Sequence, residues 1–177
     1  MKDTRELLLD SAAASFYKHG YQGANIAAIL KEVGINKGSM YHFFKSKKVL
    51  ALAVIKERIE PTLMAKYEAV LTEEHTLKSL FDTLRAAPET LVYGCPLNKM
   101  SQEMLYIDED FKHLLSEVYV SFENIIEQIL IKAKITDASS KAKLIISTYE
   151  GALMSYHLTQ DKEQFREILT TLEESLV

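Results

Sequence analysis

The 177-residue sequence contains one cysteine, three prolines and no tryptophan. A single thiol, Cys95, excludes a disulfide within the chain and a zinc site built from several cysteines. No stretch approaches the about 18 consecutive apolar residues of a membrane-spanning helix, and the charged start MKDTRELLLD does not resemble a secretory signal. We therefore expect a cytoplasmic protein that has no membrane partner.

The sequence also lacks the common enzyme motifs. It has no P-loop, no glycine-rich dinucleotide turn and no HExxH motif. A di-iron helical bundle needs two Glu-x-x-His motifs, whereas this chain offers only Asp110-x-x-His113. A Ser/His/Asp set is recognised only in space and stays open, although nothing in the sequence indicates one. We expect no enzymatic activity, no cofactor and no metal ion.

Charge is distributed unevenly along the chain. Residues 1–48 hold eight Lys or Arg and four Asp or Glu, a net charge of +4, so that the remainder carries −8 of the total of −4. A basic amino-terminal module on an acidic body suggests a polyanionic partner for the first part. Chance clustering of charge on a solvated face is the alternative.

The spacing of apolar residues predicts an all-α fold. Apolar residues recur every three or four positions over 4–19, where HGYQG ends the first helix. Two short helices follow at 25–33 and 36–43, and a fourth begins after Ser46 and is kinked or ended by Pro61. Residues 86–98 are expected to form a non-helical connector. Further helices are predicted near 62–72, 75–87, 97–106, 109–134, 138–159 and 161–176.

The helices at 25–33 and 36–43 have the spacing of a helix-turn-helix, whose second helix enters the major groove of DNA. Asn25 and Asn36 are the expected N-caps, and Gly34 ends the first of the two helices. A helix of seven or eight residues is unstable alone, so Met40 and Phe44 are expected to pack inward. The opposite side then carries the predicted DNA contacts, which are Lys37, Gly38, Ser39, Tyr41 and His42. Packing against the protein is the alternative for Tyr41 and His42.

Lys47 and Lys48 lie in the first turn of the fourth helix, where the helix dipole disfavours cations by a few tenths of a kcal/mol. The free N–H groups of the same turn attract anions. Cations at this place are explained if a phosphate group docks there. We therefore interpret Ser46-Lys47-Lys48 as a phosphate clamp.

Residues 5–55 contain the ordered series Phe16, Gly20-Tyr21, Gly34-Ile35, KGSMYHFF (37–44) and Lys45-Ser46-Lys47. In this series the sequence resembles the TetR family of bacterial transcription repressors. The resemblance implies a DNA-binding domain at 1–48, a larger helical ligand-binding and dimerisation domain at 49–177, and a homodimer that reads a palindromic operator. It also implies DNA contacts at Lys37, Gly38, Ser39, Tyr41, His42 and Lys47, with Asn25 near the DNA backbone. We add Lys45 and Lys48 to the predicted DNA contacts, although Lys48 stands where the family frequently has an acidic residue.

Residues 49–177 have two expected tasks. The first is association, because small residues cluster on one predicted helix and a nearly heptad apolar stripe runs along the last one. The predicted dimerisation residues are Gly151, Ala152, Ser155, Phe165, Ile168, Leu169 and Leu172. Packing of these faces within a monomer is the alternative.

The second expected task is the binding of a small apolar or aromatic ligand with one or two polar anchors, for which His157 and His113 are candidates. The predicted ligand contacts are Tyr93, Met100, Met104, Tyr119, Phe122, Tyr149 and Met154. Ordinary core packing is the alternative for each of them. Cys95 is either a redox-sensing thiol or an inert one.

Taken together, the sequence predicts a DNA-binding transcriptional regulator, a homodimeric repressor released by a small molecule. The alternatives are an enzyme and a helical interaction module that does not bind DNA. The second alternative leaves the lysines at the start of the fourth helix without a cause.

Overall fold

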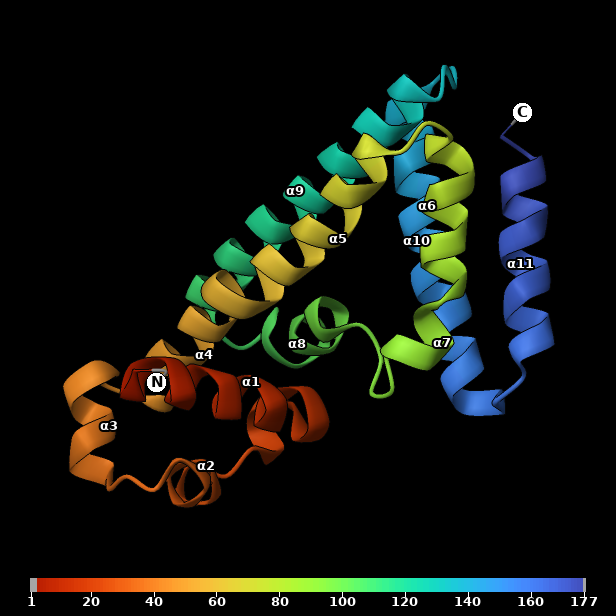
Figure 1. Cartoon of the computed structure of the whole chain (residues 1–177). Coiled ribbons are helices and arrows are strands. Elements are labelled where there is room, and N and C mark those ends of the chain that lie inside the picture. Colours follow the sequence, from red (N-terminus) through yellow and green to blue (C-terminus); the bar gives the residue numbers. More distant parts are fainter. Residues whose placement is uncertain (1–2, 177) are drawn as a thin grey trace. The chain divides into compact units, whose positions relative to one another are not determined.

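The computed structural model describes residues 3–176, which form helices and no β-strand (Figure 1). The all-α fold predicted from the sequence is confirmed. By packing, the chain divides into two compact units, one comprising the residues up to Thr62 with Pro96–Glu117, the other Leu63–Cys95 with the residues from Val118 onward. The division at residue 48 stays a prediction of where the DNA-binding part ends, since the packing units cut the chain elsewhere.

The first unit contains the predicted helix-turn-helix, and its caps form as expected. Oδ1 of Asn25 accepts a hydrogen bond from the N–H of Ala27 at 2.8 Å. Oδ1 of Asn36 accepts one from the N–H of Ser39 at 2.9 Å, and Gly34 adopts a left-handed φ of 76°. The helices of this unit are α1 (Thr4–Gly23), α2 (Ile26–Val33), α3 (Lys37–Phe43), α4 (Lys47–Val54), the π-helical η1 (Ile55–Ile59), α8 (Pro96–Met104) and the first part of α9 (Glu109–Lys132).

Helix α1 is interrupted at Gly20, where φ is 74° and ψ is 172°. Helix α8 satisfies the backbone groups around this break. Nζ of Lys99 donates to the carbonyl of Tyr17 at 2.9 Å, and the Glu103 carboxylate accepts from the N–H groups of Tyr21 and Gln22 at 3.2 and 2.9 Å. The predicted end of the first helix in HGYQG is therefore a glycine break that is capped from another helix.

One of the two expectations for Pro61, that it ends the fourth helix, is wrong. The chain continues from α4 through η1 into α5 (Glu60–Thr72). Across η1 the N–H of Glu60 donates to the carbonyl of Ile55, five residues back. A proline removes one helical N–H and crowds the preceding turn, and a π-helical turn directly before it accommodates both effects.

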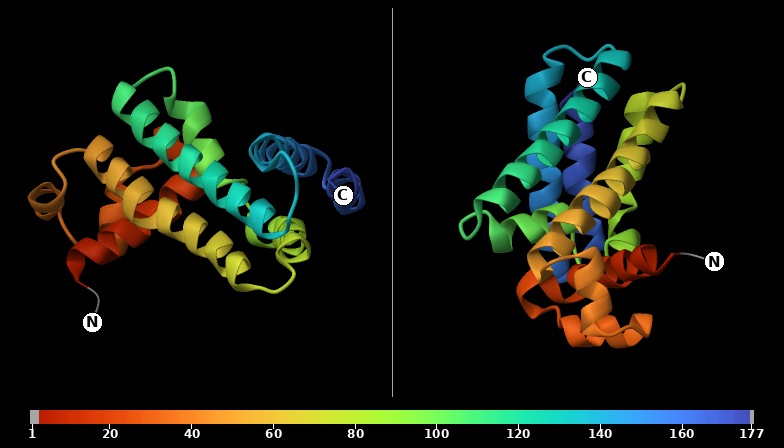
Figure 2. Two further views of the ribbon diagram at one scale, coloured as in Figure 1. Left: turned by 90° about the horizontal axis from the view of Figure 1, so that it is seen from above. Right: turned by 90° about the vertical axis from the view of Figure 1, so that its left-hand side faces the viewer.

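The second unit is a helical bundle with an aromatic core. Its helices are most of α5, then α6 (Thr76–Arg85), α7 (Ala87–Thr90), the rest of α9, α10 (Ala138–Thr159) and α11 (Lys162–Glu174). Figure 2 shows α10 and α11 side by side, and α6 packs on α11 as well. The ring centroids of Tyr67 and Phe122 are 4.9 Å apart, and those of Tyr149 and Phe165 are 6.5 Å apart.

The prediction that residues 86–98 are non-helical is wrong for Ala87–Thr90, which form α7. Pro88 lies in the first turn of this helix, where a missing N–H removes no hydrogen bond. Residues from Pro96 onward also belong to a helix, α8, which begins with its proline. Prolines that we interpreted as helix breakers are helix starters here.

A substitution at Gly20 tests the capped break. An alanine Cβ at this position would overlap with Oε1 of Glu103, and the positive φ strains any L side chain. Gly20→Ala should lower the free energy of unfolding by about 1–3 kcal/mol, measured by urea denaturation. Gly23→Ala is the control, because its Cβ meets nothing nearer than 3.7 Å. Equal stability of the two variants would contradict the role given to Gly20.

Candidate nucleic-acid interface

Helix α3 has one buried side and one exposed side. Met40 is 1% exposed and Phe44, which follows the helix, is 3% exposed. The predicted inward packing of both residues is confirmed. Lys37, Tyr41 and His42 are exposed on the other side, with Nζ of Lys37 5.7 Å from the centroid of the Tyr41 ring. A short helix anchored by two buried side chains thus presents a cation, a phenol and an imidazole to solvent.

The amino end of α3 is organised by its cap. The hydroxyl of Ser39 donates to Oδ1 of Asn36 at 3.2 Å, so its oxygen lone pairs stay available. Gly38 is exposed, and a Cβ at this position would lie 3.2 Å from Oδ1 of Asn36. The absence of a side chain therefore relieves the cap and leaves the backbone open to close approach. Asn25 is exposed and fulfils its cap role at the start of α2.

Lys45 closes the other end of α3. Its exposed ammonium donates to the carbonyl of Tyr41 at 3.1 Å. A cation is favourable there because the carbonyl groups of the last helical turn carry a partial negative charge. The predicted contact residue thus also stabilises the helix that carries the others.

Lys47 joins the start of α4 to the connector between α1 and α2. Its Nζ donates to the carbonyls of Ala24 at 2.7 Å and Gln22 at 3.4 Å, and it lies 4.8 Å from the centroid of the Tyr21 ring. Partial burial lowers the pKa of Lys47. An ammonium has three donors, so one remains for a phosphate oxygen.

Lys48 has a different environment from its neighbour. Its Nζ is 2.7 Å from Oδ2 of Asp108 and 2.6 Å from Oδ2 of Asp110, and hydrogen bonding to Asp108 raises the pKa of the lysine. The other oxygen of Asp108 accepts from the N–H groups of Asp110 and Phe111 and caps α9. Lys48 therefore lies between two carboxylates, whereas Lys47 lies on backbone carbonyls.

Sequence reasoning missed the ion pairs between α1 and η1. Arg58 contacts Asp10 through Nε at 2.7 Å and Glu6 through Nη2 at 2.6 Å, and Nη2 of Arg5 contacts Glu57 at 2.5 Å. The pKa of Glu57 is lowered chiefly by its hydrogen bond from Arg5. Each pair joins residues about fifty positions apart, and no local pattern marks such partners. The contacts of Lys99 and Glu103 with backbone groups near Gly20 were missed for the same reason, because their partners lie 81 and 82 positions away.

The predicted ligand contacts fall into different environments. Met100 and Met104 are buried in the first unit, and Phe122 and Tyr149 are buried in the second. The other three have substantial exposure, namely Tyr93 at 44%, Tyr119 at 38% and Met154 at 53%. The assignment of these seven residues to a ligand stays a prediction.

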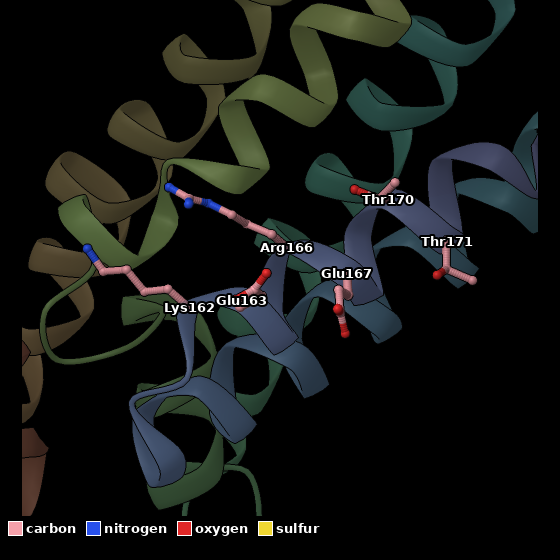
Figure 3. A pocket seen from close by; sticks show the side chains of 6 residues that line it. All are labelled: Lys162, Glu163, Arg166, Glu167, Thr170 and Thr171. Atoms are coloured by element: carbon pink, nitrogen blue, oxygen red, sulfur yellow. The ribbon is translucent and has the colours of Figure 1, made fainter.

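A polar hollow lies along α11, and Figure 3 shows the side chains that line it. They are Lys162, Glu163, Arg166, Glu167, Thr170 and Thr171. All are charged or carry a hydroxyl group, and none is a predicted ligand contact. The hollow does not match the apolar site expected from the sequence.

Most of the predicted dimerisation residues lie in the core of the second unit. Ala152 is 5% exposed, and the α11 residues Phe165, Leu169 and Leu172 are 1%, 0% and 7% exposed. Packing within one chain, the alternative stated above, accounts for their burial, and their assignment to a dimer stays a prediction. Gly151 is exposed, and Ser155 and Ile168 are half-buried.

Within residues 3–176 no helix is long and apolar enough to cross a membrane. The same residues contain no group of three or more His, Cys, Asp or Glu arranged to hold a metal ion.

Two family models match the chain. The model of the bacterial regulatory proteins of the tetR family matches residues 8–54, and that of the LmrA/YxaF-like transcriptional regulator C-terminal domain matches residues 74–171. Together with the helix-turn-helix they define a DNA-binding transcriptional regulator and not an enzyme. The chain belongs to the TetR family, with a carboxy-terminal domain of the LmrA/YxaF-like type.

Relatives align over most of both chains. An uncharacterized HTH-type transcriptional regulator from the lacX 3' region of Lactococcus lactis subsp. lactis is 28% identical, over 91% of this chain and 87% of its own. The HTH-type regulator YxaF of Bacillus subtilis is 27% identical, over 90% and 88%. The reduced form of E. coli NemR, whose curated name is that of a transcriptional repressor, has the same fold, with a TM-score of 0.88 at 19% identity over 99% and 98% of the two chains.

The Lys48–Asp108 pair makes stability depend on pH. Lys48 lowers the pKa of Asp108 in the folded chain, so the pair stabilises above the unfolded pKa of about 4 and loses its effect as pH falls through the lower folded value. Asp108→Asn keeps a cap oxygen but removes the charge. Urea denaturation should therefore show that Asp108→Asn has a lower free energy of unfolding than the unchanged chain at pH 7, and that this deficit shrinks toward pH 3.

The control for this experiment is Glu174→Gln, which changes an exposed carboxylate on α11. It should unfold like the unchanged chain at both pH values. A deficit of Asp108→Asn that is the same at pH 7 and pH 3 would show that the ion pair does not contribute.

Proposed function

We propose that this regulator is a homodimeric cytoplasmic repressor that binds a palindromic operator and is released by a small molecule bound in its carboxy-terminal part. The observation that carries the DNA-binding part is the exposed side of α3. Lys37, Tyr41 and His42 point outward while Met40 and Phe44 anchor the helix from below. A groove-reading helix needs this combination of exposed polar groups and a buried support.

The proposed contacts divide by chemistry. Lys37, Gly38 and Ser39 lie in the first turn of α3 and take the base edges and the nearest backbone. Tyr41 and His42, one turn later, take flanking phosphates. Lys47 and Lys45 contribute charge to the same backbone, and Lys48 contributes less because Asp108 and Asp110 already balance it.

Dimerisation is supported by an exposed apolar row on α10. Leu144 is 49% exposed, Met154 53% and Leu158 75%, and exposed Gly151 lies between them. The spacing of seven, three and four residues places them on one side of the helix. We propose that this row, with half-buried Ser155 and Ile168, faces a second copy of the chain. Met154 then belongs to the dimer and not to the ligand.

Release follows from the geometry of two linked heads. Two recognition helices fit successive major grooves only when they are about 34 Å apart. A ligand that binds better to a dimer with another head separation shifts the population away from DNA by its difference in affinity. Repression is supported by the curated name of the relative NemR, and ligand binding by the many aromatic and methionine side chains of the carboxy-terminal part.

Operator binding and its salt dependence test the DNA-binding part. Selection from random DNA should enrich a palindrome, and affinity for it should fall linearly with salt on a logarithmic scale. Lys47→Met should weaken binding to all sequences and reduce the salt slope by about one unit, because one phosphate contact is lost. Binding is measured by fluorescence anisotropy at several salt concentrations.

Lys48→Met is the matched control, since it removes a neighbouring lysine that is held by two carboxylates. Its slope should change by less than half of the change for Lys47→Met. A full unit lost with Lys48→Met, or none with Lys47→Met, would contradict the assignment of the phosphate contact. Failure to enrich any operator would contradict the proposed function itself.

The oligomeric state tests the α10 row. Sedimentation should give a dimer of about 40 kDa, twice the chain mass of 20.1 kDa. Met154→Glu with Leu158→Glu should produce monomers at micromolar concentration, because charges would be buried without partners. Val92→Glu replaces an apolar side chain that is 63% exposed outside the row and should leave the dimer intact. A dimer that survives the double substitution would exclude this surface.

A further inference from the structure

In the second unit, α5 carries a half-buried lysine, Lys66, that forms no ion pair with a described carboxylate. Its Nζ lies 5.6 Å from the centroid of the Tyr67 ring, and Tyr67 is only 1% exposed. Burial lowers the pKa of Lys66, and the charge of Cys95, whose thiol is buried, acts on it in the opposite direction. An ammonium ion held against apolar surface without an anion is unfavourable, so this environment requires an explanation.

A second polar group of the same unit is also unsatisfied. Nε2 of His157, in the last turn of α10, is buried, and no described residue hydrogen-bonds to it. The neighbouring groups are the ring of Tyr156, 5.4 Å away between centroids, and Gly94, where a Cβ would lie 4.0 Å from Nε2. Buried nitrogen atoms without a partner are rare in folded proteins and commonly indicate a missing ligand or water.

The two groups converge on one short segment. Lys66 acts on Cys95, and His157 lies against Gly94, the residue directly before it. Gly94 has a φ of 87° and presents no side chain, so the space beside its backbone is not filled from within the segment. An imidazole from α10 thus borders Gly94, and a cation from α5 acts electrostatically on Cys95, the next residue.

We propose that Lys66 and His157 are the polar anchors of the small-molecule site, and that its ligand is an apolar or aromatic carboxylic acid bound as the anion. The carboxylate pairs with the ammonium of Lys66, and a polar atom of the ligand satisfies Nε2 of His157. This proposal rests on the proposed function, because it assigns a chemical class to the small molecule that releases the repressor.

The surroundings favour a carboxylate over a phosphate. A phosphate dianion is usually held by arginines or by several backbone N–H groups, whereas a single lysine balances one negative charge. The nearby side chain of Tyr67 and the aromatic core behind it suit an apolar ligand body. A singly charged organic acid thus matches both the charge and the polarity of the segment.

The test uses the full chain without DNA and three pairs of probes, each an acid and its uncharged amide. The probes are benzoate, 2-naphthoate and decanoate with benzamide, 2-naphthamide and decanamide. At saturation at least one acid should raise the Tm by about 2–4 °C or more, and its amide should not. Lys66→Met should abolish the acid-dependent shift and weaken binding of that acid at least about tenfold by calorimetry.

Two further variants separate binding from folding. Without probe, Lys66→Met should be at least as stable as the unchanged chain, because it removes an unbalanced charge and keeps an apolar stem. Lys143→Met changes an exposed lysine on α10 and should retain the full acid-dependent shift. His157→Phe should weaken binding of the acid, while the amides should still cause no shift in Tm.

The proposal would be overturned if the amides raised the Tm as much as the acids, or if the acids raised the Tm of Lys66→Met equally. It would also be overturned if no acid raised the Tm. An acid-dependent Tm shift with an operator complex that persists at saturating acid would support the site and refute ligand release. A chain that binds acid through Lys66 but no operator would refute the proposed function alone. The failures of the two proposals are thus distinguishable.

Discussion

Everything that α3 presents to the outside depends on the burial of Met40 and Phe44 beneath it. A seven-residue helix does not persist in water, since its few hydrogen bonds do not offset the cost of nucleation. Two nearly fully buried side chains supply the missing stabilisation, at roughly 1.5–3 kcal/mol for each large apolar group removed from water. The Asn36 cap and Lys45 then fix the two ends of the helix. The polar side chains are therefore held in place in the free protein, which would reduce the entropy lost if they bind DNA as proposed.

The features that the sequence predicted correctly are local. Asn25, Asn36 and Gly34 act within three or four residues of their own positions, and the inward packing of Met40 follows from helical periodicity. The missed features join distant residues. Nothing in the sequence around Glu103 indicates that its carboxylate caps backbone groups 81 and 82 residues earlier. Helix α7 was missed because four residues are too few to show a period, and the apolar stripe of α11 was ambiguous because intrachain and interchain packing need the same residues.

Lys47 and Lys48 are neighbours in one helical turn, but they have different partners. Lys47 is partly desolvated on carbonyl groups, whereas Lys48 is partly exposed between two aspartates. Counting positive charges in the sequence treats the two as equal, and the net charge of the amino-terminal part therefore overstates what is available to a polyanion. Lys66 is the opposite case. It lies in a part of the chain with a net negative charge, yet it forms no ion pair with a described carboxylate.

Asp108 performs two tasks with one short side chain, since one oxygen caps α9 and the other binds Lys48. The pair consequently has a fixed polarity. Exchanging the two charges would restore an attraction between positions 48 and 108 but leave the first N–H groups of α9 without an acceptor and place a cation at its positive end. Lengthening the side chain to glutamate would move the carboxylate away from the cap. A residue at position 108 therefore has to match the backbone geometry of α9 as well as the charge of Lys48, and a cation at position 48 has its partner only while that match is kept.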